Sequence, residues 1–315
     1  MSNKIILSLH TLPIELVYRI LDNLILLDIL LSIYNVCIRL NSIIDTYHRY
    51  KTLTTFELYY RNMGSIETRN LIEALQDNMT LTTLGLVGNK IDSEGARYLA
   101  KALQNNTTLT TLTLYFKNIG NNGIKYIGEL LSKNKTLITL KLSGKKIDAQ
   151  SAQDLAEAIE NNSSLNTLEL YGNDIDVEVV KYLSAALRIN KTLTKLSLHN
   201  SHIGCDGIGY IGKVLENNTT LLTLDLRWNS IDDESVKFLS QALQKNKTLI
   251  TLDLSHNSFT NVGLEHLVDA LLKNKILTTF HLGANKIDEK GVQLLANVIK
   301  NNTVEYFNHF RITNI

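Results

Sequence analysis

The organisation of this chain is clearest in one stretch of sequence, Leu81-Thr82-Thr83-Leu84-Gly85-Leu86-Val87-Gly88-Asn89-Lys90-Ile91, which is followed by Gly95, Leu99, Ala100 and Leu103. Its first part predicts a short strand, because Leu84 and Leu86 alternate with other residues and so point to one side. Its second part predicts an amphipathic helix, because Leu99 and Leu103 stand four residues apart. One unit therefore consists of a strand, a turn, a helix and a second turn.

The same unit recurs with a fixed period. Leucine stands every 28 residues, without insertion, at Leu53, Leu81, Leu109, Leu137, Leu165, Leu193, Leu221, Leu249 and Leu277. A constant period of this length is typical of a solenoid, in which each unit buries the apolar side of its neighbours. Strands pair about 4.8 Å apart, whereas helix axes need about 10 Å. The stack should therefore bend into a horseshoe with a concave, all-parallel sheet.

Residues 51–315 resemble the ribonuclease-inhibitor type of leucine-rich repeat. The resemblance rests on the leucine spacing and on two recurring positions: a glycine at Gly95, Gly123, Gly207, Gly263 and Gly291, and a turn asparagine at Asn89, Asn173, Asn229, Asn257 and Asn285. The glycine is replaced at Glu67, Ser151, Val179 and Ser235, and the asparagine at Arg61, Lys117, Lys145 and Ser201. Where the asparagine remains, we expect its amide to bond turn backbone that the strand leaves unsatisfied. The shortened last unit predicts a closing strand over 303–312.

Composition points away from several classes of function. The formal net charge of the 315-residue chain is +1, so no overall field draws it to nucleic acid or to a membrane. Two cysteines, Cys37 and Cys205, cannot form a disulfide framework, which favours a reducing compartment. The apolar run Ile5-Ile6-Leu7 is too short for a secretory core, and Leu24 to Ile33 is too short to span a bilayer. We therefore expect an intracellular protein, cytoplasmic or nuclear.

Glycosylation sequons recur after the predicted helices, for example at Asn78, Asn134 and Asn246. They occupy one position of the repeat, where asparagine commonly ends a helix. We interpret them as structural residues.

The first fifty residues do not share the repeat. Pro13 and Glu15 suit the first turn of a helix, and Leu16, Ile20, Leu24 and Leu27 continue it at spacings of three and four. The segment resembles an F-box through Leu12-Pro13-x-Glu15-Leu16, Ile20-Leu21, Asp28-Ile29-Leu30 and Val36-Cys37, although Leu40 stands where that family usually has tryptophan. The resemblance implies a small all-α head that docks the adaptor subunit of a cullin–RING ubiquitin ligase through Leu12, Pro13, Glu15, Leu16, Ile20, Leu21 and Val36. The alternative is that residues 1–50 only cap the first repeat.

The concave side of the sheet is the predicted site of partner binding. Strand residues that alternate with the core leucines should face the concavity, and they include many aromatic and charged side chains, the composition of binding hot spots. The predicted partner-binding residues are Tyr59, Tyr115, Phe116, Tyr171, His199, Asp225, Arg227, Trp228, Asp253 and His256.

Two features of the sequence resemble sites of other kinds. Asp225 and Asp253 fall in one column of adjacent strands, close enough for one carboxylate to raise the pKa of the other, but Arg227 should neutralise them. The run Gly207-Ile208-Gly209-Tyr210-Ile211-Gly212 spells a dinucleotide fingerprint, yet it lies inside a predicted helix, away from a strand end. We expect no enzyme activity, no metal site and no cofactor.

The sequence thus predicts an α/β leucine-rich-repeat horseshoe with a small helical head. Our functional hypothesis is a substrate-receptor subunit of a cullin–RING ligase, which holds a protein target on its concave face. The alternative is a regulatory leucine-rich-repeat protein without ligase coupling, such as a GTPase-activating protein or an immune-type scaffold.

Overall fold

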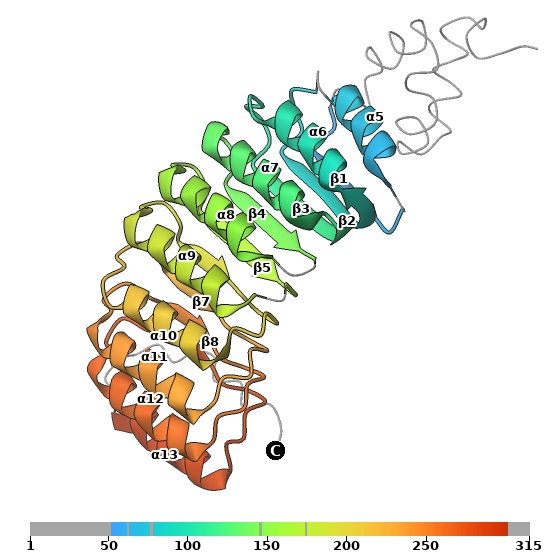
Figure 1. Ribbon diagram of the computed structural model, residues 1–315. Helices are drawn as coiled ribbons and strands as arrows, with labels where there is room; N and C mark the ends of the chain where they lie inside the picture. Colours follow the sequence, from blue (N-terminus) through green and yellow to red (C-terminus); the bar gives the residue numbers. More distant parts are fainter. Residues whose placement is uncertain (1–51, 62, 76–77, 145–146, 174, 302–315) are drawn as a thin grey trace, which may run out of the picture.

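Figure 1 shows the computed structural model of the chain. It describes residues 52–61, 63–75, 78–144, 147–173 and 175–301, without the side chains at 74, 116–118 and 298–301. The predicted helical head at 1–50, with its adaptor-binding residues, lies outside the described residues, as does the predicted closing strand at 303–312. Both stay predictions.

Strands and helices alternate through the described residues. The strands are β1 (Thr55–Tyr59), β2 (Thr83–Asp92), β3 (Thr111–Asn118), β4 (Thr139–Ser143), β5 (Thr167–Tyr171), β6 (Lys195–Ser197), β7 (Thr223–Asp225), β8 (Thr251–Asp253) and β9 (Thr279–His281). The helices are α5 (Ser65–Leu75), α6 (Ser93–Leu103), α7 (Gly120–Lys133), α8 (Ala149–Asn161), α9 (Val177–Ile189), α10 (Gly204–Leu215), α11 (Asp233–Lys245), α12 (Asn261–Lys273) and α13 (Glu289–Asn301).

The strands form one parallel sheet in sequence order. Each begins to pair with the next in the register of the repeat, so that Leu84 of β2 lies beside Leu112 of β3 and Asp225 of β7 beside Asp253 of β8. Between β2 and β3 this register shifts after Leu86. The helices line the opposite, convex side of a curved stack (Figure 1). The predicted horseshoe with a concave parallel sheet is confirmed.

The core lies between the sheet and the helices. Of the nine recurring leucines, all from Leu81 to Leu277 are buried, and Leu53 at the start of the stack is partly buried. Leu84 and Leu86 of β2 and Leu99 of α6 are fully buried as well, as the two periodicities predicted. Each repeat thus depends on its neighbours to shield its leucines from water.

The turn asparagines connect successive repeats. The amide of Asn229 donates to the carbonyl of Leu198 at 2.8 Å, and its oxygen accepts the backbone N–H of Ser201 at 3.1 Å. Ser201, which replaces the asparagine one repeat earlier, donates its hydroxyl to the carbonyl of Leu170 at 3.1 Å. The predicted bonding of turn backbone is confirmed. Ser201 keeps the hydrogen bond to the carbonyl of the preceding repeat that the asparagine amide makes elsewhere.

The asparagines that end the helices form a second set of bridges. Asn162 is the C-cap of α8 and is only 3% exposed. Its amide donates to the carbonyl of Leu131 in the preceding repeat at 2.7 Å, and its oxygen accepts the backbone N–H groups of Ser164 and Leu165 at 2.9 and 2.6 Å. The helix-ending role was predicted from the sequence, but the bridge to the preceding repeat was not.

The glycosylation sequons owe their pattern to these bridges. Asn134 and Asn246 are buried, and their amide nitrogens donate to the carbonyls of Leu103 and Leu215. The sequon hydroxyl of Thr136 in turn donates to the backbone carbonyl of Asn106 at 2.9 Å. A glycan on either asparagine would displace a bond between repeats, which agrees with the structural interpretation.

Adjacent asparagines provide a test of the bridge. We expect Asn162→Ala to lower the free energy of unfolding by about 2–3 kcal/mol, because buried backbone groups lose their partners. Asn161→Ala, at the exposed neighbouring position, should change it by less than about 0.5 kcal/mol. Urea unfolding followed by circular dichroism measures both, and equal effects would refute the bridge.

Candidate functional site

The concave surface, here called the inner wall, carries the strand side chains that point away from the core, together with side chains from the first three residues after each strand. In β5, for example, Leu168 and Leu170 are buried, whereas Thr167, Glu169 and Tyr171 are partly exposed. Because the strands begin to pair at the spacing of the repeat, equivalent positions form columns that cross the sheet. Side chains at equivalent positions of successive repeats are therefore neighbours on this surface.

One column carries a row of stacked rings, here called the aromatic row: Tyr115, Tyr171 and His199. The centroids of Tyr115 and Tyr171 are 6.4 Å apart at an interplanar angle of 16°, and those of Tyr171 and His199 are 5.1 Å apart at 3°. Ser143 of β4 lies between the two tyrosines in this column and is small enough for the rings to meet above it. The row is a flat apolar surface with polar edges, which suits recognition of another molecule.

A second aromatic pair follows β7 and β8. Trp228 and His256 stack with centroids 4.0 Å apart and planes 8° apart, and Trp228 is 54% exposed. Both residues have positive φ, 59° and 54°, at a repeat position where Gly88 and Gly172 stand elsewhere. Tyr60, Asn200 and Ala284 share this positive φ at the same repeat position, so the conformation belongs to the repeat and does not by itself mark Trp228. Trp228 is also the only tryptophan of the chain.

The paired carboxylates of β7 and β8 are held by one arginine. Arg227 donates to the two carboxylate oxygens of Asp225 at 2.9 and 2.7 Å, and its Nε lies 3.3 Å from Asp253. Burial alone would raise the pKa of Asp225, but hydrogen bonds from the side chain and backbone of Arg227 outweigh it and hold that pKa below its ordinary value. A general acid needs the opposite shift, so the arrangement favours a fixed ion cluster, as the sequence predicted.

Serine, histidine and aspartate also meet beside this cluster, but not in a catalytic arrangement. The Ser197 hydroxyl donates to Asp225 at 3.0 Å and lies 3.1 Å from Nδ1 of His199. The hydroxyl has one proton, so this contact requires Nδ1 of His199 to be the donor, and His199 cannot act there as a base. Ser197 is also only 2% exposed, beyond the reach of a substrate.

A third cluster lies across β4, β5 and β6 and was not among the predicted site residues. The two oxygens of Glu169 lie 3.2 Å from the ammonium of Lys141 and 2.8 Å from that of Lys195. Burial alone would raise the pKa of Glu169, but the bond from Lys195 and the charge of Lys141 hold it below its ordinary value. One signal was available in the sequence: lysine stands at 195, in a column otherwise occupied by threonine.

The structure brings most of the predicted residues into three groups: the aromatic row, the Asp225–Arg227–Asp253 cluster, and the Trp228–His256 pair. Tyr59 is the outlier, on β1, where its hydroxyl donates to Glu57 at 2.8 Å. The side chain of Phe116 lies outside the described residues. These roles in partner binding stay predictions.

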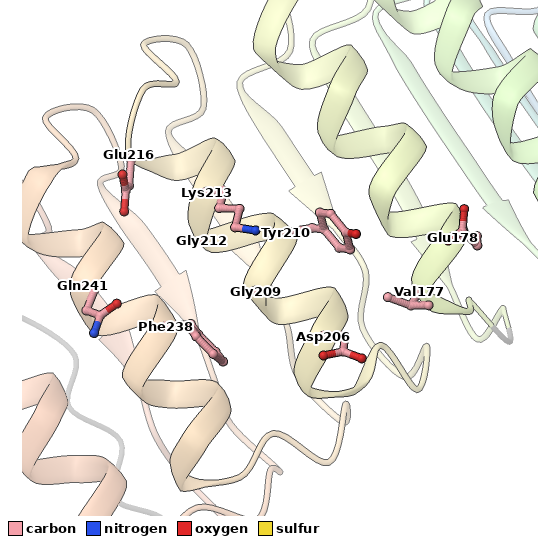
Figure 2. Close-up of a pocket in the computed structure, with 10 residues that line it drawn as sticks. All are labelled: Val177, Glu178, Asp206, Gly209, Tyr210, Gly212, Lys213, Glu216, Phe238 and Gln241. Carbon is pink, nitrogen blue, oxygen red and sulfur yellow. The ribbon is translucent and has the colours of Figure 1, made fainter.

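The convex side has a groove of about 570 Å³ between α9, α10 and α11. Figure 2 shows Tyr210 and Phe238 on either side of Gly209, with the Lys213 amine directed toward the Tyr210 ring. Gly209 opens this space, since the same position carries Lys181 and Lys237 in the neighbouring helices. The apparent dinucleotide fingerprint is thus helical, as predicted, with no turn after a strand to hold a pyrophosphate.

Two further observations concern the described residues alone. None of the helices there is both long and apolar enough to cross a bilayer. No group of three or more histidine, cysteine, aspartate or glutamate side chains in that part of the chain is arranged to hold a metal ion.

Comparison with known proteins identifies the repeats. A family model described as "Leucine Rich repeat" matches residues 77–100, 217–240 and 245–268, and no curated protein matches the chain. The chain therefore carries leucine-rich repeats, a scaffold for protein–protein interaction. The ribonuclease-inhibitor subtype stays a resemblance.

One solved structure is similar in fold, and two others match less well. A chain in the crystal structure of the Rad7 and Elc1 complex from yeast is 16% identical with a TM-score of 0.56, and the match covers 82% of this chain and 63% of that one. An internalin from Listeria monocytogenes is 19% identical, with a TM-score of 0.41 and coverage of 83% and 89%. The actin-binding site 2 of leiomodin-1 is 26% identical, with a TM-score of 0.41 and coverage of 49% and 88%.

The carboxylate of Asp225 gives a pH-dependent prediction. Because its pKa is lowered in the folded chain, its contribution to stability is present above the unfolded pKa of about 4 and is lost as pH falls through the folded value. We expect Asp225→Asn to lower the free energy of unfolding by about 1–3 kcal/mol at pH 7. The difference from the unmodified chain should shrink toward pH 3.

Urea titrations at pH 7, 5 and 3 measure this difference. Glu265→Gln, at an exposed position of α12, serves as the control and should have little effect at any of the three values. A difference for Asp225→Asn that grows with acidity would contradict the assigned charge state.

Proposed function

We propose that the chain is a substrate-receptor subunit of a cullin–RING ubiquitin ligase, intracellular and without catalytic residues of its own. Residues 1–50 would dock on the ligase adaptor, while the inner wall holds a protein target. The observation that carries the binding role is Trp228, which is 54% exposed and stacks on His256 beside the Asp225–Arg227–Asp253 cluster. The mechanism is positional, since tethering raises the effective concentration of the target near the ligase.

The inner wall supports binding more than chemistry. Its carboxylates are fixed by Arg227 and by two lysines, and its serine hydroxyl is buried. Its exposed features include tyrosine and tryptophan rings and Arg227, residue types that are enriched at the hot spots of protein interfaces. Several of these side chains are already held by stacking or ion pairs within the chain, so they need little ordering when a partner binds.

The ligase role rests on the head. Its support is the F-box resemblance of Leu12-Pro13-x-Glu15-Leu16 and Val36-Cys37. The Rad7 and Elc1 structure adds that a chain of similar fold occurs in a complex of two proteins. A cap for the first repeat would not require these motifs, and the same segment can serve both purposes.

Adaptor binding tests the ligase role. We expect the full chain to capture the recombinant adaptor, and Leu12→Asp combined with Pro13→Ala to abolish capture, because a charge enters the apolar docking face and the helix start is altered. Ile189→Asp is the control, since it places the same charge at an exposed apolar residue of α9. Pull-down with purified proteins is the measurement, and lack of capture by the unmodified chain would refute the ligase role.

Partner binding by the inner wall can be tested with a substitution that should leave the fold intact. Trp228→Gly removes the ring at a positive φ that glycine adopts without strain, so the free energy of unfolding should change by less than about 1 kcal/mol. Ala284→Gly is the matched control, in the same column at φ 55°. In affinity capture from cells, proteins held by the unmodified chain and by Ala284→Gly should be lost with Trp228→Gly. Retention of the same proteins would remove Trp228 from the binding surface.

A further inference from the structure

The cluster on β4–β6 has an excess of positive charge. Glu169 is the single carboxylate between Lys141 and Lys195, so the three side chains carry a formal charge of +1. Each ammonium has three N–H donors, and only one contact to this carboxylate is made by each. The lysines therefore retain donors for a further acceptor.

The depth of the charged groups on the inner wall also favours an acidic ligand. The carboxylates lie deep, with side-chain exposures of 13% for Glu169, 12% for Asp225 and 19% for Asp253. The cations stand above them, with exposures of 37% for Lys141, 41% for Lys195 and 41% for Arg227. Although these six residues sum to zero formal charge, an approaching molecule meets cations first.

The carboxylates are also occupied by internal donors. Asp225 accepts hydrogen bonds from Ser197, from the backbone N–H of Arg227 and from its guanidinium. Asp253 accepts the backbone N–H of Ser255 at 2.9 Å and lies against Arg227. A basic ligand would have to displace Arg227 to reach them, whereas an acidic ligand at the lysines displaces nothing.

The span of the aromatic residues on the inner wall indicates how long a complementary peptide would be. Tyr171 follows Glu169 by two residues on the same face of β5, so the aromatic row lies beside the lysines. From Tyr115 on β3 to His256 after β8 the rings cover five strand spacings, about 24 Å. An extended peptide of about seven residues spans that distance.

We propose that the inner wall binds an extended acidic segment of its protein partner. A carboxylate of that segment accepts hydrogen bonds from the N–H groups of Lys141 and Lys195 that Glu169 leaves unused, and its neighbouring aromatic side chains lie against Tyr115, Tyr171 and His199. The proposal rests on the partner-binding role given above for this wall, and it adds the chemistry of the partner.

Synthetic peptides test the proposal with the full-length chain. The probe is a fluorescein-labelled nine-residue peptide that alternates glutamate and phenylalanine, compared with versions carrying glutamine or lysine in place of glutamate. In anisotropy titrations at low salt, we expect the glutamate peptide to bind at least about fivefold more tightly than the glutamine peptide, since two exposed lysines each add a modest gain. The preference should fall as salt is added.

Substitutions in the chain test which lysines cause the preference for the glutamate peptide over the glutamine peptide. Lys141→Gln with Lys195→Gln should remove it, and the triple change that adds Glu169→Gln should do the same without leaving a buried carboxylate unpaired. The matched control is Lys125→Gln with Lys237→Gln, two exposed lysines of α7 and α11, which should keep it.

Three results would overturn the proposal: equal binding of the glutamate and glutamine peptides, tighter binding of the lysine peptide, or an equal loss in the control variant. Such a failure is distinguishable from failure of the proposed function. Adaptor capture depends on residues 1–50, and the Trp228→Gly test does not depend on the charge of the partner.

Discussion

The fold depends on hydrogen bonds that one repeat makes to backbone of the next. A strand–turn–helix unit leaves carbonyl and N–H groups unsatisfied where its helix ends and where its strand turns away. Asparagine fills both places, because its amide donates and its oxygen accepts in the same side chain. Asn190 illustrates this: it donates to the carbonyl of Ile159 at 2.7 Å and accepts the N–H groups of Thr192 and Leu193. The bridge works only if the period never changes, since one inserted residue would move donor and acceptor apart.

The same constraint organises the inner wall. Since the strands pair at the spacing of the repeat, with a shift only where β2 and β3 end, equivalent side chains fall into columns, and contacts between repeats become possible at long sequence separation. Tyr115 and Tyr171 are 56 positions apart by their numbering, yet their rings stack because the intervening repeat offers Ser143 in that column. Arg227 likewise reaches a carboxylate of its own strand and one of the next. The wall is thus a rigid surface whose chemistry varies along the stack while its geometry is constant.

Much of this architecture followed from the sequence, because leucine spacing and strand alternation are local patterns. Which residues share a column also followed, since a fixed period converts sequence position into spatial position, and Asp225 beside Asp253 was predicted on that basis. The missed features depend on side-chain conformation across repeats. The helix-end asparagines were interpreted only locally, and the Lys141–Glu169–Lys195 cluster was not singled out because its members occupy two different columns. Positive φ at Trp228 was also missed, although Gly88 and Gly172 at the same repeat position were a signal for it.

The asparagine bridge is tested most directly by amide hydrogen exchange. Thr192 and Leu193 lie in the connection between α9 and β6, where amides of an ordinary loop exchange rapidly. Bonded to the buried Asn190 oxygen at 2.9 and 2.8 Å, they should instead exchange as slowly as the amides in the middle of α9. Exchange of these two amides at the rate of an exposed loop would show that the repeats are not joined in this way.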